Sequence, residues 1–269
     1  MEFRGLRLLA MTFGIVMLVS ALRAVEIIGH RGAAYDAPEN TLASFQTAWA
    51  QGADAVELDL WLSEDGRLVV MHDADTKRVG GSTNKIAAQT WDQLQRLDVG
   101  AWKSLQFKGE KIPPLESVLA TIPAGKRAVL EIKCGPEIVP ELQRVIQVSG
   151  RKPSELAIIS FNFAALREAK RKLPEIEHYV LADYRKDAKT GLMPELAPLV
   201  TRVKAAKLDG LDLHFKWPID KTFVADVKRA GLKLVVWTVN DPATARRLSD
   251  AGVDGITTDR PGWLREQLK

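Results

Sequence analysis

Residues 55–73 read AVELDLWLSEDGRLVVMHD, two apolar runs joined by a short polar segment. The runs Ala55–Leu62 and Arg67–Met71 both have the composition of strands, and only Ser63-Glu64-Asp65-Gly66 separates them. A connection between parallel strands needs a dozen or more residues. This link therefore predicts an antiparallel hairpin.

The expected register of this hairpin gathers charged side chains on one face. We take Leu62 to lie opposite Arg67 across the turn, which places Glu57 opposite His72. Directly opposed residues point to the same face of a sheet, and Asp59 shares that face because side chains alternate along a strand. We therefore expect His72 to lie beside the two carboxylates.

Outside the hairpin, strand-like runs alternate with helical patterns, which argues for a parallel sheet. With Arg67–Met71 assigned to the hairpin, the remaining strands match the number in a TIM (β/α)8 barrel. They are Val25–Gly29, Ala55–Leu62, Ala128–Ile132, Leu156–Ser160, Glu177–Leu181, Gly210–Leu213, Leu234–Val239 and Gly255–Thr258. Helices are expected at Thr41–Gln51, Glu137–Val148, Phe163–Lys172, Lys221–Ala230 and Ala243–Ala251.

The length of 269 residues suits one barrel domain, which we place at residues 25–269. Residues 74–114 interrupt the alternation and carry Trp91, Trp102 and Phe107. So long a segment after a strand end predicts an insertion on the catalytic face. The net charge of +4 is spread along the chain, so no nucleic-acid partner is expected. The oligomeric state is left open.

The N-terminus has the pattern of a secretory leader. Arg4 and Arg7 precede the uncharged run Leu8–Leu22, and small residues follow. We interpret residues 1–24 as a signal peptide, so the mature protein would be periplasmic or secreted, with no stable membrane span after cleavage. The alternative is an N-terminal membrane anchor. Cleavage is favoured because the first strand begins at Val25 and leaves no tether.

Polar side chains end three successive strands of the predicted barrel, where catalytic residues of this fold lie. Buried carboxylates without partners are costly, so several converging on one barrel mouth imply a cation. Oxygen ligands favour one hard divalent ion, Mg²⁺ or Ca²⁺. The alternative is a set of structural salt bridges, such as Glu131 with Lys133 or Asp59 with Arg31. The whole set is His30, Arg31, Glu57, Asp59, Glu131 and Lys133.

Two of the four histidines follow apolar strands near the acidic residues. His30 and His72 are therefore candidates for a general acid and a general base. Arg31 and Lys133 offer cations for phosphate oxygens. The combination indicates metal-assisted acid–base cleavage of a phosphate ester.

Other polar residues near these strand ends are assigned structural roles or left open. Asn40 or Thr41 is expected to cap the following helix. Glu39 either bonds the loop backbone or reaches the site. Asp259 is expected to serve closure of the barrel rather than catalysis. His178 is expected to be structural.

The order of motifs from Ile27 to Pro261 resembles the glycerophosphodiester phosphodiesterase family. The matching pieces are HRG (30–32), PENT (38–41), GADAVELDL (52–60), VVMHD (69–73), LEIK (130–133), SFN (160–162), VWTVN (236–240) and GVDGITTDRP (252–261). The resemblance implies a TIM barrel with His30 and His72 as the acid–base pair. It implies Glu57, Asp59 and Glu131 as metal ligands. It implies phosphate contacts for Arg31 and Lys133, and substrate contacts for Phe161 and Trp237.

The resemblance also implies the reaction: hydrolysis of a glycerophosphodiester to glycerol 3-phosphate and an alcohol. The nucleophile is either water or the substrate's own glycerol hydroxyl, through a cyclic phosphate. The rivals are a lysophospholipase D or sphingomyelinase D, which a long apolar acyl channel would favour, and a catalytically silent phosphodiester-binding protein.

Overall fold

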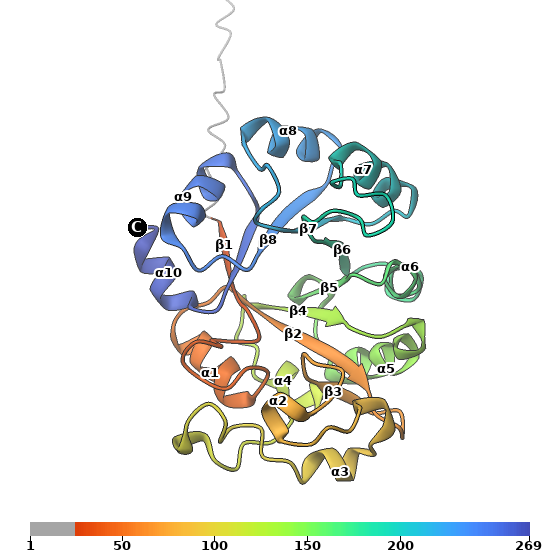
Figure 1. The fold of residues 1–269 in the computed structure, drawn as a ribbon, viewed down its shortest axis with the longest axis vertical. Coiled ribbons are helices and arrows are strands. Elements are labelled where there is room, and N and C mark those ends of the chain that lie inside the picture. Colours follow the sequence, from red (N-terminus) through yellow and green to blue (C-terminus); the bar gives the residue numbers. More distant parts are fainter. Residues whose placement is uncertain (1–24) are drawn as a thin grey trace, which may run out of the picture.

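The computed structural model describes residues 25–269, and the predicted signal peptide lies outside the described residues. Eight parallel strands close into a barrel because β1 pairs with both β9 and β2 (Figure 1). The expected TIM (β/α)8 barrel is confirmed. Its strands are β1 (Glu26–Gly29), β2 (Ala55–Leu62), β4 (Arg127–Ile132), β5 (Leu156–Ser160), β6 (Glu177–Ala182), β7 (Gly210–His214), β8 (Lys233–Trp237) and β9 (Gly255–Thr258).

Helices cover the outside of the barrel, and side-chain caps fix where several begin. Asn162 accepts hydrogen bonds from two backbone N–H groups at the start of α6, and Asp220 and Asp241 each accept one at α8 and α9. The helices are α1 (Leu42–Ala50), α4 (Leu115–Ala120), α5 (Val139–Ser149), α6 (Phe163–Lys172), α7 (Leu196–Ala205), α8 (Lys221–Arg229), α9 (Pro242–Ala251) and α10 (Pro261–Gln267). Within residues 25–269 no helix is long and apolar enough to cross a membrane.

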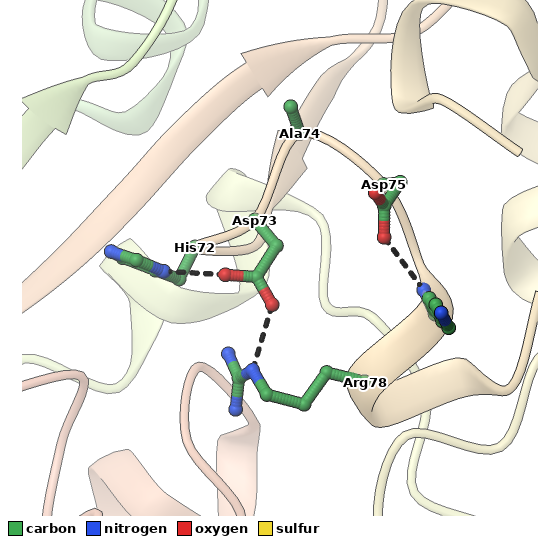
Figure 2. Close-up of a pocket in the computed structure, with 6 residues that line it drawn as sticks. His72, Asp73, Ala74, Asp75 and Arg78 are labelled. Atoms are coloured by element: carbon green, nitrogen blue, oxygen red, sulfur yellow. Dashed lines mark hydrogen bonds and ion pairs between the residues drawn. The ribbon is translucent and has the colours of Figure 1, made fainter. Parts of the chain in front are cut away.

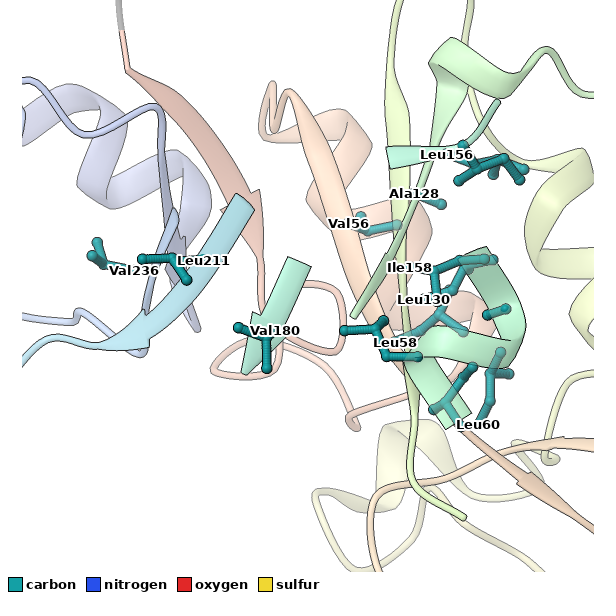
Figure 3. Close-up of a cluster of buried hydrophobic side chains, with 14 of the residues drawn as sticks. Val56, Leu58, Leu60, Ala128, Leu130, Leu156, Ile158, Val180, Leu211 and Val236 are labelled. Atoms are coloured by element: carbon teal, nitrogen blue, oxygen red, sulfur yellow. The ribbon is translucent and has the colours of Figure 1, made fainter. Parts of the chain in front are cut away.

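The main apolar core lies between the strands and the helices. Leu58, Leu130 and Ile158 are fully buried there, as Figure 3 shows for this cluster. Burial of such a side chain contributes about 1.5–3 kcal/mol, so these contacts hold the barrel wall to its helices. Since side chains alternate along a strand, the neighbouring residues Glu57 and Glu131 point into the barrel.

The predicted hairpin is present, but its predicted register was wrong by one residue. In β3 (Leu68–Val70), Leu68 and not Arg67 lies opposite Leu62. The Ser63 N–H donates to the Arg67 carbonyl oxygen, and Gly66 has φ +76°, so the turn is one residue shorter than assumed. A left-handed glycine is typical of such a three-residue turn.

His72 reaches the acidic residues by a route that the register argument did not contain. β4 occupies one edge of β2, so β1 and β3 share the other edge. β1 pairs with Ala55–Val56 and β3 with Leu60–Leu62, and the segment Glu57–Asp59 lies between them. His30 follows β1 and His72 lies just beyond β3. The two histidines therefore approach the same stretch of β2 from opposite directions.

The insertion at residues 74–114 forms a small layer beside β2 and β3 (Figure 1). It contains α2 (Lys77–Gly80), α3 (Trp91–Gln95) and two 3₁₀ turns, Ile86–Ala88 and Leu105–Phe107. Its own apolar cluster includes Val69 and Met71 from the hairpin, and Val79, Ile86, Leu94, Val99 and Ile112 from the insertion, with Trp61, Trp91 and Leu97 packed against it. This cluster anchors the insertion to the strand that leads to His72.

Candidate active site

Three buried carboxylates converge inside the barrel mouth. Glu57 and Asp59 come from β2, and Glu131 comes from β4, where its Cα lies opposite that of Asp59. One carboxylate oxygen of each lies within 4.8 Å of the others. The structure thus brings together the three residues predicted to bind a metal.

The charge of this cluster is only partly compensated. Lys133 Nζ lies 2.9 Å from Glu131 Oε1 and 3.3 Å from Asp59 Oδ1, and Arg31 Nε lies 3.4 Å from Asp59 Oδ2. Both salt bridges of the structural alternative therefore exist. Two cations still face three carboxylates, and Glu57 Oε1 is buried without a hydrogen-bond partner. Such an oxygen suits a hard divalent cation.

The pKa values of the carboxyl groups reflect this imbalance. Burial raises the pKa of Glu57 well above its ordinary value, and the charges of Asp59 and Glu131 raise it further. Burial and Asp59 likewise raise the pKa of Glu131. Burial opposes ionisation of Asp59, but Lys133 and Arg31 lower its pKa to about 2. The cluster would favour a cation that lets all three groups ionise.

His72 is held by its chain neighbour. Its Nδ1 donates to Asp73 Oδ1 over 2.7 Å (Figure 2), which leaves Nε2 free. The Trp61 indole donates to the His72 carbonyl oxygen over 3.2 Å and fixes the backbone. Burial lowers the pKa of His72, so the neutral imidazole predominates at neutral pH.

His30 is held by a residue that was assigned a purely structural role. Its Nδ1 donates to Asp259 Oδ1 over 2.7 Å, and Asn240 Nδ2 donates to the other oxygen of Asp259 over 2.6 Å. The expectation of barrel closure for Asp259 did not include this contact with His30. The Asp259 carboxylate therefore fixes the orientation of the His30 ring.

The loop after β1 carries two left-handed non-glycine residues, Arg31 (φ +52°) and Asn40 (φ +58°). Such backbone is sparsely populated and needs support from its surroundings. The Arg31 N–H donates to Glu57 Oε2 over 3.0 Å, and Asn40 Nδ2 donates to Asp59 Oδ2 over 2.8 Å. Asn40 thus serves the acidic cluster, while Thr41 caps α1. Glu39 reaches the site, since it accepts from Arg31 Nη1 over 2.8 Å.

A cavity of about 70 Å³ joins these groups to an apolar wall. Phe161 and Trp237 belong to this wall and meet edge to face with ring centroids 5.6 Å apart. His214 lies against the Trp237 ring at 5.0 Å. The whole lining is His30, Arg31, Glu57, His72, Glu131, Lys133, Ile159, Phe161, Leu181, Asp212, Trp237 and Thr257. Every residue predicted for the site except Asp59 lines this cavity, and Asp59 lies just behind it.

A wider cleft of about 650 Å³ opens beside His72. Most of its lining residues are polar or charged, and they come largely from the start of the insertion: His72, Asp73, Ala74, Asp75, Lys77 and Arg78 (Figure 2). His72 lines both this cleft and the inner cavity.

Asp212 is a site residue that sequence reasoning missed. It lies on β7, is 2% exposed, and its Oδ1 has no hydrogen-bond partner. Burial and the charge of Glu131 raise the pKa of Asp212 well above its ordinary value. The signal was the pattern of β7, where Leu211 and Leu213 face the helices and Asp212 must face inward. His178, by contrast, is fully buried, as its predicted structural role requires.

Comparisons with known proteins agree on one family. The family model described as the glycerophosphoryl diester phosphodiesterase family matches residues 30–263. A glycerophosphodiester phosphodiesterase of Caldanaerobacter subterraneus is 32% identical over 88% of this chain and 95% of its own length. An Oleispira antarctica phosphodiesterase, solved with the product sn-glycerol-3-phosphate, has a TM-score of 0.82 and 30% identity, over 91% of this chain and 97% of its own. A Thermotoga maritima glycerophosphodiester phosphodiesterase has a TM-score of 0.71 and 28% identity, over 90% and 97%.

Proposed function

Since the chain belongs to the glycerophosphodiester phosphodiesterase family and is a hydrolase of that class, we propose that it uses a bound divalent cation and two histidines to release glycerol 3-phosphate and an alcohol. The observation that carries this proposal is the buried three-carboxylate cluster beside two carboxylate-held histidines. The product found in the Oleispira antarctica relative supports glycerol 3-phosphate as the retained half.

Glu57, Asp59 and Glu131 would hold the cation, Mg²⁺ or Ca²⁺. The support is chemical: the donors are all oxygens, and one of them, Glu57 Oε1, is buried with no hydrogen-bond partner. A divalent cation bound there would neutralise charge on the phosphate and polarise it for attack.

Arg31 and Lys133 would orient the phosphate. Both side chains line the inner cavity, and both are fixed by carboxylates, Arg31 by Glu39 and Lys133 by Glu131. The planar guanidinium of Arg31 can contact two phosphate oxygens, whereas Lys133 supplies a compact charge.

His72 would act as the general base and His30 as the general acid. The lowered pKa of His72 keeps its imidazole neutral and able to accept a proton from the attacking hydroxyl, of water or of the glycerol. The new bond forms between that oxygen and phosphorus, and the bond from phosphorus to the alcohol oxygen breaks. Attack by water gives glycerol 3-phosphate directly. Attack by the glycerol hydroxyl gives a cyclic phosphate, which a second attack by water would open to glycerol 3-phosphate. His30, supported by Asp259, would deliver a proton to the departing alcohol.

The alcohol itself would be hydrophilic. Phe161 and Trp237 would contact the carbon atoms of the glycerol, which belongs to the half of the substrate that stays in the inner cavity. The outer cleft beside His72 is lined by charged side chains, Asp75, Lys77 and Arg78 among them, which favours a polar head group over an acyl chain.

A substrate panel tests this proposal. Purified protein would be incubated with glycerophosphocholine, glycerophosphoethanolamine and lysophosphatidylcholine. Released glycerol 3-phosphate would be measured with a coupled dehydrogenase. Cleavage of the lysolipid would be followed by its released choline, because its other product is lysophosphatidic acid. We expect glycerol 3-phosphate from the first two. Cleavage of the lysolipid alone would favour the lysophospholipase D alternative.

We also propose that the protein is exported, because Arg4, Arg7 and the uncharged run after them have signal-peptide order. Protein recovered from its native cell should begin near Val25 and lie outside the cytoplasm. N-terminal sequencing that finds Met1 on a cytoplasmic protein would contradict export.

A further inference from the structure

One side chain of the insertion connects two parts of the site. Arg78, on α2, donates through Nε to Asp73 Oδ2 over 2.7 Å (Figure 2). Its Nη1 and Nη2 donate to the two oxygens of Glu39, each over 2.7 Å. A single guanidinium thus uses all three of its nitrogens on two carboxylates that lie 34 positions apart in sequence (73 − 39).

Each of these carboxylates has a second partner in the site. Asp73 accepts from His72 Nδ1 with its other oxygen, over 2.7 Å. Glu39 accepts from Arg31 Nη1, over 2.8 Å. Arg78 is therefore linked to His72, the proposed base, through Asp73. It is linked to Arg31, the proposed phosphate ligand, through Glu39. It lines the outer cleft but not the inner cavity.

We propose that Arg78 is a positioning residue, which sets the orientation of His72 through Asp73 and that of Arg31 through Glu39. This inference rests on the roles given above to His72 and Arg31. It assigns the insertion a part in the reaction, because the insertion supplies the side chain that aligns two elements of the barrel mouth.

The chemistry of the contact favours this role over a surface ion pair. Glu39 is only 12% exposed, and its carboxylate is shared between Arg78 and Arg31. Without Arg78, Glu39 keeps one cation and Asp73 keeps only His72, so both carboxylates are free to turn. A lysine could replace the charge but not the fork that bonds both groups at once.

The surroundings hold Arg78 in place. Its guanidinium lies 5.7 Å from the centre of the Trp102 ring, which is also part of the insertion. On the same helix, Val79 is buried in the insertion's apolar cluster. The Arg78 side chain is 42% exposed, so its position depends on its hydrogen bonds to Asp73 and Glu39 and on the Trp102 ring rather than on burial.

The test compares Arg78→Gln and Arg78→Lys with Arg171→Gln. Arg171 is a matched control because it forms a two-pronged ion pair with Glu168 on α6, outside both cavities. We expect kcat/KM for glycerophosphocholine to fall roughly tenfold to a hundredfold in Arg78→Gln, the effect of a misplaced catalytic group. Arg78→Lys should show an intermediate loss, and Arg171→Gln none, while all three melt within a few degrees of the parent.

Two further measurements separate positioning from general stability. Asp73→Asn should reduce kcat strongly in the parent but little in the Arg78→Gln background, because both changes break one chain of contacts. Nitrogen NMR of the imidazole should show the Nδ1–H tautomer of His72 in the parent and a mixture in Arg78→Gln. If Arg78→Gln does not fold, the His72 tautomer is compared between the parent and Arg78→Lys. A mixture of tautomers in Arg78→Lys supports the inference, and an unchanged Nδ1–H tautomer contradicts it.

An unchanged kcat/KM in Arg78→Gln, or an equal Asp73→Asn effect in both backgrounds, would overturn the inference. The variant His72→Ala is measured in parallel. If it keeps full activity, the role of His72 itself is wrong, and that failure belongs to the proposed mechanism rather than to Arg78.

Discussion

In both halves of the barrel, side chains along each strand alternate between the interior and the helices. The two halves differ in the type of side chain that faces the interior. In the half made by β9, β1, β2 and β4, the inward positions near the mouth hold Glu57, Asp59 and Glu131, and Thr257 of β9 lines the same cavity. In the half made by β5 to β8, they hold mainly apolar side chains such as Leu181 and Trp237. The first half gives up stability by burying charge, and the second gains it from apolar contact.

This contrast indicates how the site divides its tasks. The two histidines proposed to transfer protons, His30 and His72, lie where two loops and a hairpin supply hydrogen-bond partners. The opposite wall, which includes Phe161 and Trp237, contributes an apolar surface. Asp212 is the exception in the apolar half. Its Oδ1 has no hydrogen-bond partner, and the charge of Glu131, from the other half, raises its pKa.

The largest expected effect is the loss of kcat when a histidine of the charged half is replaced. His72→Ala or His30→Ala should lower kcat by roughly a hundredfold or more, because each removes a proton-transfer group. His214→Ala, at the mouth end of the apolar half, should cost less than about tenfold. Circular dichroism would check that the variants fold. Comparable losses at all three histidines would show that the division does not hold.

A smaller effect is expected from the apolar wall. Trp237→Ala should raise KM for glycerophosphocholine roughly tenfold and change kcat less, since a wall that contacts the substrate throughout the reaction contributes uniform binding. Initial rates over a range of substrate concentrations give both constants. A fall in kcat as large as that of His72→Ala would place Trp237 in the chemistry.

The smallest effect concerns stability of the metal-free protein. The folded state raises the pKa of Glu131 to about 7 from 4.5, so it binds more protons than the unfolded chain between these values, and stability is lost as pH rises through them. Glu131→Gln removes this cost. Its Tm should exceed that of the parent at pH 8 by roughly 2–8 °C, or about 1–3 kcal/mol, and by less at pH 5.

The matched variant for this prediction lies in the apolar half. Leu181→Ala should lower Tm by similar amounts at both pH values, because a lost apolar contact carries no proton linkage. Added Mg²⁺ or Ca²⁺ should raise the Tm of the parent more than that of Glu131→Gln. A pH-independent difference between Glu131→Gln and the parent would contradict the pKa argument.

Much of the fold was predictable because it depends on local pattern. Most predicted strands begin and end within one or two residues of the observed ones, and α6 matches Phe163–Lys172 as predicted. The hairpin register was missed because it depends on the backbone of a single residue, Gly66. Nothing in the periodicity of the flanking strands distinguishes the two turn lengths.

Site residues at the carboxyl ends of strands could be predicted from the sequence. Site residues that depend on contacts between distant loops could not. Glu57 and Glu131 could be placed from alternation alone. The partners of the catalytic groups could not: Asp259 meets His30 across 229 positions, and Arg78 meets Glu39 across 39. Such pairs form only when the barrel closes and the insertion folds over it.

Metal dependence of glycerol 3-phosphate release tests the central claim most directly. Purified protein would be stripped with a chelator, assayed on glycerophosphocholine, and assayed again after addition of Mg²⁺, Ca²⁺ or Zn²⁺. The account predicts that stripping abolishes release and that Mg²⁺ or Ca²⁺ restores it. Full activity in the metal-free protein, or restoration by Zn²⁺ alone, would contradict it.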